Sequence, residues 1–339
     1  MWPRHARPIA AAVLWLLLLS ACGDDSISAA GADAAATGDG DDAAEDVDAA
    51  TVGAAGSPQE MGMLQIQVGD LLFDARVAGP ADGEPVILLH GFPQTSYSYR
   101  HQLRALADAG YRAVAPDQRG YSPGARPPAV EDYTLDKLVQ DVIDIADAQG
   151  FARFHLVGHD WGSAVAWYLA GAYPDRLASL TTLSVPHPLA FADALNDPDS
   201  EQTAMSSYMS YFRSEGSEDE ITAGGAAQLR TFYEGVPEED VDVYVEALGT
   251  PDALRGGLNW YRANDFAQPP APGPITMPAM YVWSDQDTAL GRDGAEGTTA
   301  YVEGPYRFEI IEGVNHWIPD NAPEQLNTLL LDHVAAYPL

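Results

Sequence analysis

The chain of 339 residues has little cysteine and little positive charge. Cys22 is its only cysteine, which excludes a disulfide within one molecule. Lys137 is its only lysine, and 17 Lys and Arg residues face 50 Asp and Glu residues, for a formal net charge of −33. Because nucleic acids and anionic lipid surfaces repel such a protein, neither is an expected partner. A saline habitat and a biased genome composition explain the acid excess equally well.

Long apolar runs are also scarce, and the one at the start is short. Ile9–Leu19 spans 11 residues, which is too few to cross a bilayer. It follows Arg4 and Arg7, and a basic segment before a short apolar run is typical of a signal peptide. We therefore predict a signal peptide at residues 1–21 rather than a membrane-spanning helix.

The end of this run, Leu19-Ser20-Ala21-Cys22, resembles a bacterial lipoprotein signal. The resemblance implies cleavage before Cys22 and acylation of that residue, with two or three chains providing a stable anchor. The alternative is an ordinary secretory signal with an incidental cysteine. Gly23, rather than Asp, follows Cys22, so the inner-membrane retention residue used by some bacteria is absent. We expect an exported protein, lipid-anchored in the bacterial cell envelope, with the outer membrane or cell surface favoured.

Residues 22–60 have the composition of a tether. Between Gly23 and Gln59 the chain is rich in Ala, Gly and Asp, with nine acids and no Lys or Arg. Low hydrophobicity and charge of one sign predict a disordered, self-repelling segment. An acidic tail that binds a metal or a partner is the alternative. The sequence thus divides into a signal peptide, a tether and one large domain at 61–339.

The domain alternates short apolar strands with helical patterns. Met63–Val77 reads as a hairpin around Val68-Gly69-Asp70, and Pro85–Leu89 is a continuous apolar run typical of a buried parallel strand. Further strands are predicted at 111–115, 154–158, 178–185, 279–283 and 308–311, and helices at 96–109, 135–149 with Thr134 as N-cap, 162–173, 295–302 and 323–336. This alternation predicts an α/β fold whose mostly parallel sheet is covered by helices on both faces. Residues 187 to about 272 carry helical patterns and aromatics without a convincing strand, so they are predicted to be an insertion.

The most informative segment is Gly158-His159-Asp160-Trp161-Gly162, between a predicted strand and a predicted helix. A small-x-nucleophile-x-small sequence there is the nucleophile elbow of an α/β-hydrolase, with glycines expected to permit the sharp turn. The central residue is Asp rather than Ser. A carboxylate is suited to displacing a leaving group from saturated carbon, which forms an ester. The elbow therefore favours hydrolysis of epoxides or carbon–halogen bonds, and an Asp that only caps the helix is the alternative.

Four further motifs accompany the elbow in the same chain. They are His90-Gly91-Phe92-Pro93, Asp117-Gln118-Arg119-Gly120-Tyr121, Leu258-Asn259-Trp260-Tyr261-Arg262 and Ser207-Tyr208-Met209-Ser210-Tyr211-Phe212. Together with the elbow they resemble the epoxide hydrolase branch of the α/β-hydrolases over residues 62–339. The resemblance implies an α/β-hydrolase fold with a helical cap inserted after the sixth strand, and hydrolysis of an epoxide to a vicinal diol. It also implies a cis Phe92–Pro93 bond.

The resemblance assigns roles to particular residues. Asp160 is the expected nucleophile, and the backbone N–H groups of Phe92 and Trp161 form the expected oxyanion hole. His316 follows the last strand, where this fold places its general base. The acid that orients His316 is Asp285 or Asp287, and the family's W-G-x-x-D pattern selects Asp287.

Tyrosines of the insertion decide the substrate class, because opening an epoxide creates an alkoxide that needs a proton donor. The resemblance selects Tyr261 and Tyr208, with Tyr211 as the rival of Tyr208 and packing as the other role. A small apolar epoxide and water are then the substrates. The sequence contains no Cys/His ligand cluster and no Gly-rich phosphate loop, so neither metal nor nucleotide cofactor is expected.

Two other functions remain open. A dehalogenase would use the same Asp160, His316 and Asp287. Haloalkane dehalogenases commonly have Asn where this chain has Phe92, and fluoroacetate dehalogenases usually have Arg where it has Trp161, so both comparisons favour an epoxide. A catalytically silent surface protein on the same scaffold is the third possibility, and the complete triad argues against it.

Overall fold

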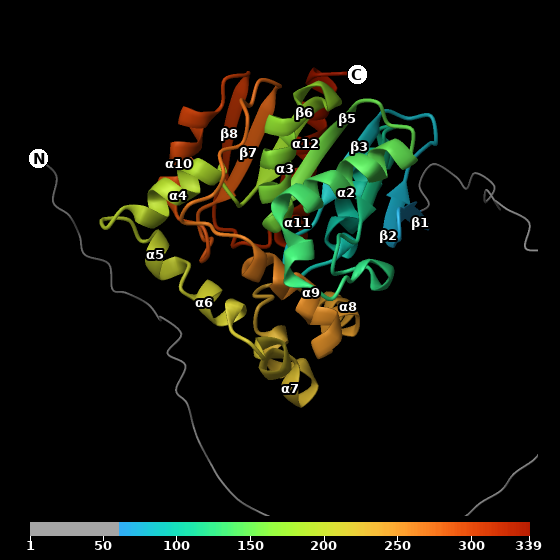
Figure 1. Cartoon of the computed structure of the whole chain (residues 1–339). Coiled ribbons are helices and arrows are strands. Elements are labelled where there is room, and N and C mark those ends of the chain that lie inside the picture. The colour runs from blue at the N-terminus through green and yellow to red at the C-terminus, as the bar shows by residue number, and fades with distance from the viewer. Residues whose placement is uncertain (1–60) are drawn as a thin grey trace, which may run out of the picture. The chain divides into compact units, whose positions relative to one another are not determined.

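The computed structural model describes residues 61–339 (Figure 1). The predicted signal peptide, Cys22 and the acidic tether lie outside the described residues. Within 61–339, no helix has both the length and the apolar character needed to cross a membrane.

Eight strands form one sheet, in the order β1-β2-β4-β3-β5-β6-β7-β8. β1 and β2 form the predicted hairpin, β2 also pairs antiparallel with β4, and the other neighbours are parallel. The strands are β1 Gly62–Val68, β2 Leu71–Ala78, β3 Pro85–Leu89, β4 Arg112–Pro116, β5 Phe154–His159, β6 Leu177–Leu183, β7 Ala279–Ser284 and β8 Tyr306–Ile311. The predicted α/β class with a mostly parallel sheet is confirmed.

Helices cover both faces of the sheet (Figure 1). The sheet helices are α1 Arg100–Asp108, α2 Leu135–Ala148, α3 Trp161–Ala172, α10 Arg292–Gly297 and α12 Pro323–Ala336. Successive side chains of a strand point to opposite faces. Val86 and Leu88 of β3 accordingly belong to the apolar cluster with α1 and α12, whereas Ile87 and Leu89 belong to the cluster with α2 and α3.

Three predicted elements differ from the structure. The helix predicted at 96–109 starts as a 3-10 turn, Ser96–Tyr99, before α1, and the one predicted at 295–302 divides into α10 and a 3-10 turn, Thr298–Tyr301. The strand predicted to reach residue 185 ends at Leu183, because Ser184 adopts a left-handed φ of 66°. Strand pairing cannot continue through such a residue.

The start of α2 corrects another expectation. Thr134 occupies the N-cap position, but its side chain makes no capping hydrogen bond. Instead Oδ1 of Asn264, far along the chain, accepts a hydrogen bond from the N–H of Leu135 at 3.0 Å. A residue near the end of the insertion therefore supplies the hydrogen bond that we expected from the local sequence.

Between β6 and β7 the described chain contains helices and no named strand. These are α4 Pro188–Asn196, α5 Gln202–Met205, α6 Tyr208–Arg213, α7 Ser217–Arg230, α8 Glu238–Leu248 and α9 Pro251–Ala263, and the short helix α11 Ile318–Asn321 follows β8. Figure 1 shows α5 to α9 beyond one end of the strands. This is the end at which β5 leads into α3. We call α4 to α9 the cap.

The cap is docked on the core through a backbone contact. A Cβ atom on Gly256 of α9 would lie 2.4 Å from the carbonyl oxygen of Gly120, so only glycine fits there. Next to this contact, the indole N–H of Trp260 donates to the carbonyl of Arg119 at 2.9 Å. The Arg119–Gly120 turn thus fixes the position of α9, which carries Tyr261.

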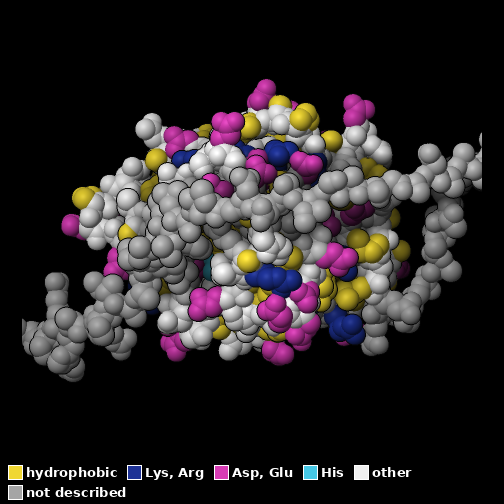
Figure 2. Space-filling view, turned by 90° about the horizontal axis from the view of Figure 1, so that it is seen from below, with side chains coloured by type: hydrophobic (Ala, Val, Ile, Leu, Met, Phe, Trp, Pro, Cys, Tyr) yellow, Lys and Arg dark blue, Asp and Glu magenta, His cyan; other side chains and the backbone are white. Residues whose placement is uncertain are grey.

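The acid excess is visible on the surface. Asp and Glu side chains are spread over the face seen in Figure 2, and Lys and Arg side chains are fewer there. The electrostatic field of the protein therefore attracts cations to this face and repels anions, while neutral molecules are unaffected.

Candidate active site

Asp160 lies in the sharp turn between β5 and α3. Its backbone has φ 51° and ψ −120°, a conformation that is strained for any residue with a side chain. We expected glycine to take the unusual dihedral angles, but the structure gives them to the aspartate itself. Gly158 and Gly162 serve close approach instead, because a Cβ atom on Gly162 would lie 1.9 Å from the carbonyl oxygen of Leu89.

Ser163, one turn into α3, secures this turn to the neighbouring strand. Its buried hydroxyl donates to the carbonyl of Gly158 at 2.7 Å and accepts from the N–H of Leu183 at 2.9 Å. Both partners are backbone groups at the ends of β5 and β6. The side chain therefore helps to maintain the strained geometry of Asp160.

The two carboxylate oxygens of Asp160 have different surroundings. Oδ1 accepts a hydrogen bond from the N–H of Phe92 at 2.8 Å, and the adjacent backbone N–H of Trp161 favours the charged carboxylate, which lowers its pKa. The Phe92–Pro93 bond is cis, as the resemblance implied. Close approach of this loop requires Gly91, since a Cβ atom there would lie 2.3 Å from Asp160. Oδ2 faces His316, with Nε2 at 3.5 Å.

His316 lies between two carboxylates. Its Nδ1 is 2.8 Å from Oδ2 of Asp287, whose Oδ1 accepts from the N–H groups of Ala289 and Leu290. Asp285, the other acid considered, accepts from the N–H of Gly313 and makes no contact with His316. The structure thus brings Asp160, His316 and Asp287 together and leaves Asp285 outside the site.

The charges of these groups are coupled. Burial opposes a charge on His316, but the adjacent carboxylates of Asp287 and Asp160 outweigh it and raise the pKa of His316 to about 10. Burial likewise opposes ionisation of Asp160, yet the hydrogen bond and charge of His316 hold the pKa of Asp160 below its ordinary value. In the resting enzyme the pair is therefore an imidazolium next to a carboxylate.

Two residues that the sequence did not identify hold the backbone of His316. Nε2 of His159 lies 2.9 Å from the His316 carbonyl oxygen, and the hydroxyl of Ser184 donates to the same oxygen at 3.2 Å. Burial lowers the pKa of His159 to about 4, so this ring is neutral at pH 7. No local sequence pattern indicates these two hydrogen bonds, because each joins a residue at the end of a strand to the distant loop that carries His316.

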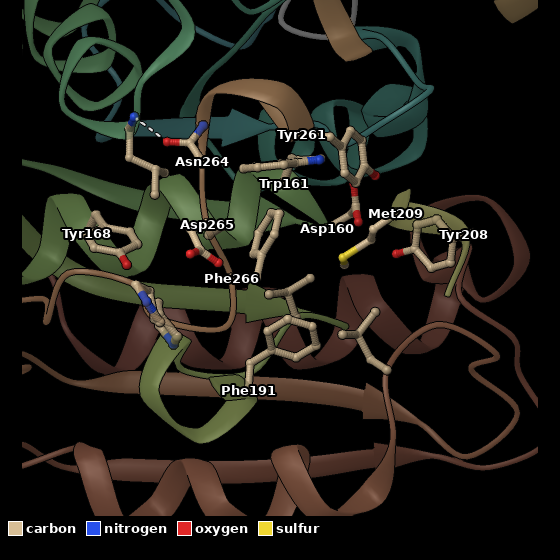
Figure 3. A pocket seen from close by; sticks show the side chains of 16 residues that line it. Asp160, Trp161, Tyr168, Phe191, Tyr208, Met209, Tyr261, Asn264, Asp265 and Phe266 are labelled. Carbon is tan, nitrogen blue, oxygen red and sulfur yellow. Dashed lines mark hydrogen bonds between the residues drawn. The ribbon is translucent and has the colours of Figure 1, made fainter. Parts of the chain in front are cut away.

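Tyr208 of α6 and Tyr261 of α9 reach the pocket above Asp160 from the cap (Figure 3). Their ring centroids are 6.4 Å apart. Burial raises the pKa of both phenols, so both stay protonated and able to donate. Tyr211 does not line this pocket, and its hydroxyl donates to Glu220 at 3.0 Å instead. The geometry thus separates the two rivals in favour of Tyr208.

The pocket is a concave site that opens to solvent. Most of its lining is apolar or aromatic. Besides Asp160, Trp161 and the two tyrosines, the lining residues are Leu135, Ala164, Tyr168, Val185, Pro188, Phe191, Met209, Asn264, Asp265, Phe266, Pro269 and Leu290. In residues 61–339, His, Cys, Asp and Glu side chains do not gather into a group of three or more that could hold a metal ion.

An aspartate in a strand–helix elbow, with a histidine and a second aspartate beside it, is the arrangement of a hydrolase with a carboxylate at the nucleophile position. Residues 84–323 match the model of the alpha/beta hydrolase fold family. The chain belongs to the α/β-hydrolase family and is a hydrolase.

Individual relatives agree with this assignment. An AB hydrolase superfamily protein of Bacillus subtilis is 33% identical over 281 residues, which cover 79% of this chain and 96% of that protein. Epoxide hydrolase A of Mycobacterium tuberculosis is 32% identical over 301 residues, which cover 77% of this chain and 94% of that protein. The crystal structure of epoxide hydrolase A from Mycobacterium thermoresistibile superimposes with a TM-score of 0.71 at 29% identity, covering 83% of this chain and all of that one.

Proposed function

We propose that this protein is an epoxide hydrolase that opens an epoxide to a vicinal diol through an ester on Asp160. One observation carries the proposal. The Asp160 carboxylate is bound through Oδ1 to a backbone N–H, while it lines an apolar pocket into which two protonated tyrosines project. A carboxylate nucleophile opposite two phenol donors fits a strained ring that must be attacked at carbon and protonated at oxygen. The relatives named epoxide hydrolase support the same substrate class.

The first step forms the ester. Oδ2 of Asp160 attacks the less hindered carbon of the epoxide, and the carbon–oxygen bond of the ring breaks with its electrons going to the ring oxygen. Tyr208 or Tyr261 transfers a proton to that oxygen, which leaves a hydroxyl on the bound product and a tyrosinate on the enzyme. The mostly apolar lining lowers the local dielectric constant, which strengthens the hydrogen bonds of both tyrosines.

The second step cleaves the ester. Alkylation removes the negative charge of Asp160, so the pKa of His316 falls and its proton passes, through the pocket, to the tyrosinate. The neutral imidazole then deprotonates a water molecule that attacks the ester carbonyl carbon of Asp160. The N–H groups of Phe92 and Trp161 bind the developing oxyanion on Oδ1. The intermediate collapses, and His316 gives its proton to the departing diol oxygen. The carboxylic acid left on Asp160, with one oxygen from water, then transfers its proton to His316, which restores the carboxylate and the imidazolium.

A single-turnover reaction of the His316→Gln variant with styrene oxide tests the proposal. Without a base the ester should accumulate, and intact-mass spectrometry should show one added styrene oxide mass, mapped to the peptide that contains Asp160. The double variant Asp160→Asn/His316→Gln is the matched control and should gain no mass. If a haloalkane instead leaves an alkyl group on that peptide and styrene oxide leaves nothing, the enzyme is a dehalogenase. If neither reagent adds mass, the ester mechanism is wrong.

We further propose that Cys22 carries lipid and that residues 22–60 tether the enzyme to the bacterial cell envelope, after removal of 1–21. The support is the sequence Leu19-Ser20-Ala21-Cys22 and the acidic composition of the segment that follows. Expression of the full chain with a radioactive or alkyne-labelled fatty acid should label the wild type but not Cys22→Ser. Equal labelling of both forms, or release of both into the soluble fraction, would overturn the anchor.

A further inference from the structure

The polar side chains at the mouth of the pocket are not equally free to bind a substrate. The amide of Asn264 is occupied, because Oδ1 accepts from Leu135 and Nδ2 donates to two backbone carbonyls. The hydroxyl of Tyr168 donates to the carbonyl of Pro270 at 2.8 Å. These two residues therefore shape the mouth, and their main hydrogen bonds are already made.

Asp265 differs from both. Its Oδ1 accepts from the N–H of Ala267 at 2.9 Å, which orients the carboxylate, whereas Oδ2 has no hydrogen-bond or ion-pair partner in residues 61–339. Arg213, which binds the same segment, donates to the carbonyls of Tyr261 and Asn264 and forms no ion pair with Asp265. Its guanidinium lies over the Phe266 ring, 5.7 Å from the centroid. The mouth of the pocket thus presents an oriented carboxylate with an unused oxygen.

Aromatic rings accompany this carboxylate. In Figure 3 the Asp265 carboxylate is drawn between the rings of Tyr168 and Phe266, and all three residues line the pocket. The faces of aromatic rings attract ammonium groups, and a neighbouring carboxylate adds direct charge attraction. Because the Arg213 guanidinium already lies over the Phe266 ring, the Tyr168 ring and the Asp265 carboxylate are the groups that suit an organic cation, and they do not suit an anion.

The distance from the reacting carbon follows from helix geometry. Trp161, Ala164 and Tyr168 line the pocket from one side of α3, at spacings that keep them on the same face of a helix. A rise of 1.5 Å per residue places Tyr168 about 10 Å along the axis from Trp161, which adjoins Asp160. An extended substrate with its epoxide at Asp160 could therefore place its other end beside Asp265.

We propose that Asp265 and Tyr168 form a cation subsite, and that the enzyme prefers epoxides whose far end carries an ammonium group across an apolar spacer. The preference rests on the proposed epoxide hydrolase function and specifies its substrate class. The acid excess of the whole chain acts in the same direction, since it attracts cations and repels carboxylates.

Three matched phenyl glycidyl ethers test the subsite. Their para substituents are trimethylammoniomethyl, the uncharged isostere neopentyl, and carboxymethyl. For the wild type we expect kcat/KM to decrease in that order. In Asp265→Asn, which keeps the side-chain shape, the ratio of kcat/KM for the ammonium and neopentyl ethers should fall about two- to five-fold, the range of an exposed ion pair. The ratio should also fall as salt is added to the wild type.

The control variant is Asp82→Asn, which removes the same charge from an exposed position in the turn between β2 and β3. It should leave the ratio unchanged. An equal change in both variants, no change in Asp265→Asn, or a wild-type preference for the carboxymethyl ether would overturn the subsite.

Absence of turnover with all three ethers, the neutral one included, would instead overturn the proposed function. Calorimetric titration with the three corresponding diols needs no turnover and measures the subsite separately. Asp265→Asn should weaken binding of the ammonium diol relative to the neopentyl diol by a similar factor, and equal affinities in wild type and variant would contradict the proposal.

Discussion

Nε2 of His316 lies 3.5 Å from Oδ2 of Asp160. The opposite nitrogen of the same ring contacts Asp287, so one imidazole bridges two buried carboxylates. Two negative charges around one ring favour its protonated form, which in turn stabilises Asp160 as an anion. In the proposed mechanism, His316 can therefore act as a base only after Asp160 has lost its charge, and this would order the two chemical steps.

The first prediction concerns the nucleophile. Asp160→Asn keeps the size and hydrogen-bonding shape of the side chain but removes the attacking anion, so turnover of styrene oxide should fall by at least about a thousand-fold. Circular dichroism should stay close to that of the wild type, which shows that the fold is intact. An Asp160→Ala variant with full activity would exclude this residue as the nucleophile.

The second prediction concerns the protonation of His316. In the wild type, the imidazole should titrate with a pKa near 10. Asp160→Asn removes one of the two neighbouring charges, so the pKa of His316 should fall in that variant, as it should in the alkyl-enzyme. NMR of ¹⁵N-histidine-labelled protein over pH 5 to 11 measures both values. An unchanged pKa in Asp160→Asn would show that Asp160 does not control the base.

The third prediction concerns stability, because the raised pKa of His316 links folding to proton binding. The pKa of His316 is about 10 in the folded protein and about 6.5 in an unfolded chain, so the folded state binds the proton more tightly. The stability that this contributes is fully present below about pH 6.5 and is lost as the pH rises through about 10. The difference in Tm between wild type and His316→Gln should therefore shrink across that window. A difference that is constant or grows with pH would contradict the sign.

The fourth prediction separates the tyrosines. Tyr208→Phe and Tyr261→Phe each remove one donor to the developing alkoxide, and a hydrogen bond to a charged group contributes about 1.5–3 kcal/mol. Each should lower the rate of ester formation about ten- to a hundred-fold, measured by stopped-flow quenching of tryptophan fluorescence. Tyr211→Phe is the matched control, because its hydroxyl contacts Glu220 rather than the pocket. An equal loss in the control would assign the effect to cap packing.

The fifth prediction concerns docking of the cap. Gly256→Ala places a methyl group against the Gly120 carbonyl, and overpacking of this kind costs about 1–3 kcal/mol. Thermal unfolding should show a lower Tm, and kcat should fall because α9 carries Tyr261. Gly297→Ala is the control, since its new Cβ would lie 3.6 Å from the Cβ of Ala190, an ordinary contact. A wild-type Tm for Gly256→Ala would mean that the cap contact relaxes freely.

Several elements could be predicted because their physical causes are local. A continuous apolar run such as Pro85–Leu89 must be buried on both faces, and the structure has β3 at those residues. The elbow sequence around Asp160 is equally local, since a strand must turn sharply into a helix there. Motifs with characteristic neighbours, such as those around Phe92, His316 and Asp287, could likewise be identified without knowing where they meet.

Other features depend on residues far apart in the sequence. Thr134 looks like the N-cap of α2, yet Asn264 supplies the hydrogen bond, because the chain after the cap passes over the start of that helix. The resemblance selects Tyr208 with Tyr211 as its rival, but only the tertiary structure shows that Tyr208 lines the pocket and Tyr211 does not. Ser184 supports His316 because the segment that follows β8 comes back to the end of β6, although β7 separates these two strands in the sheet.

The sequence by itself determined the fold class, the carboxylate at the elbow and the residue types available for chemistry, because periodicity and turn-forming residues act over a few positions. The tertiary structure decided which of those residues meet, which charges are coupled and which polar atoms remain free. The physical reason is that hydrogen bonds and charge interactions act over a few ångströms in space, whatever the separation along the chain. Two features depend on such contacts in space. They are the position of His316 between Asp160 and Asp287 and the free oxygen of Asp265.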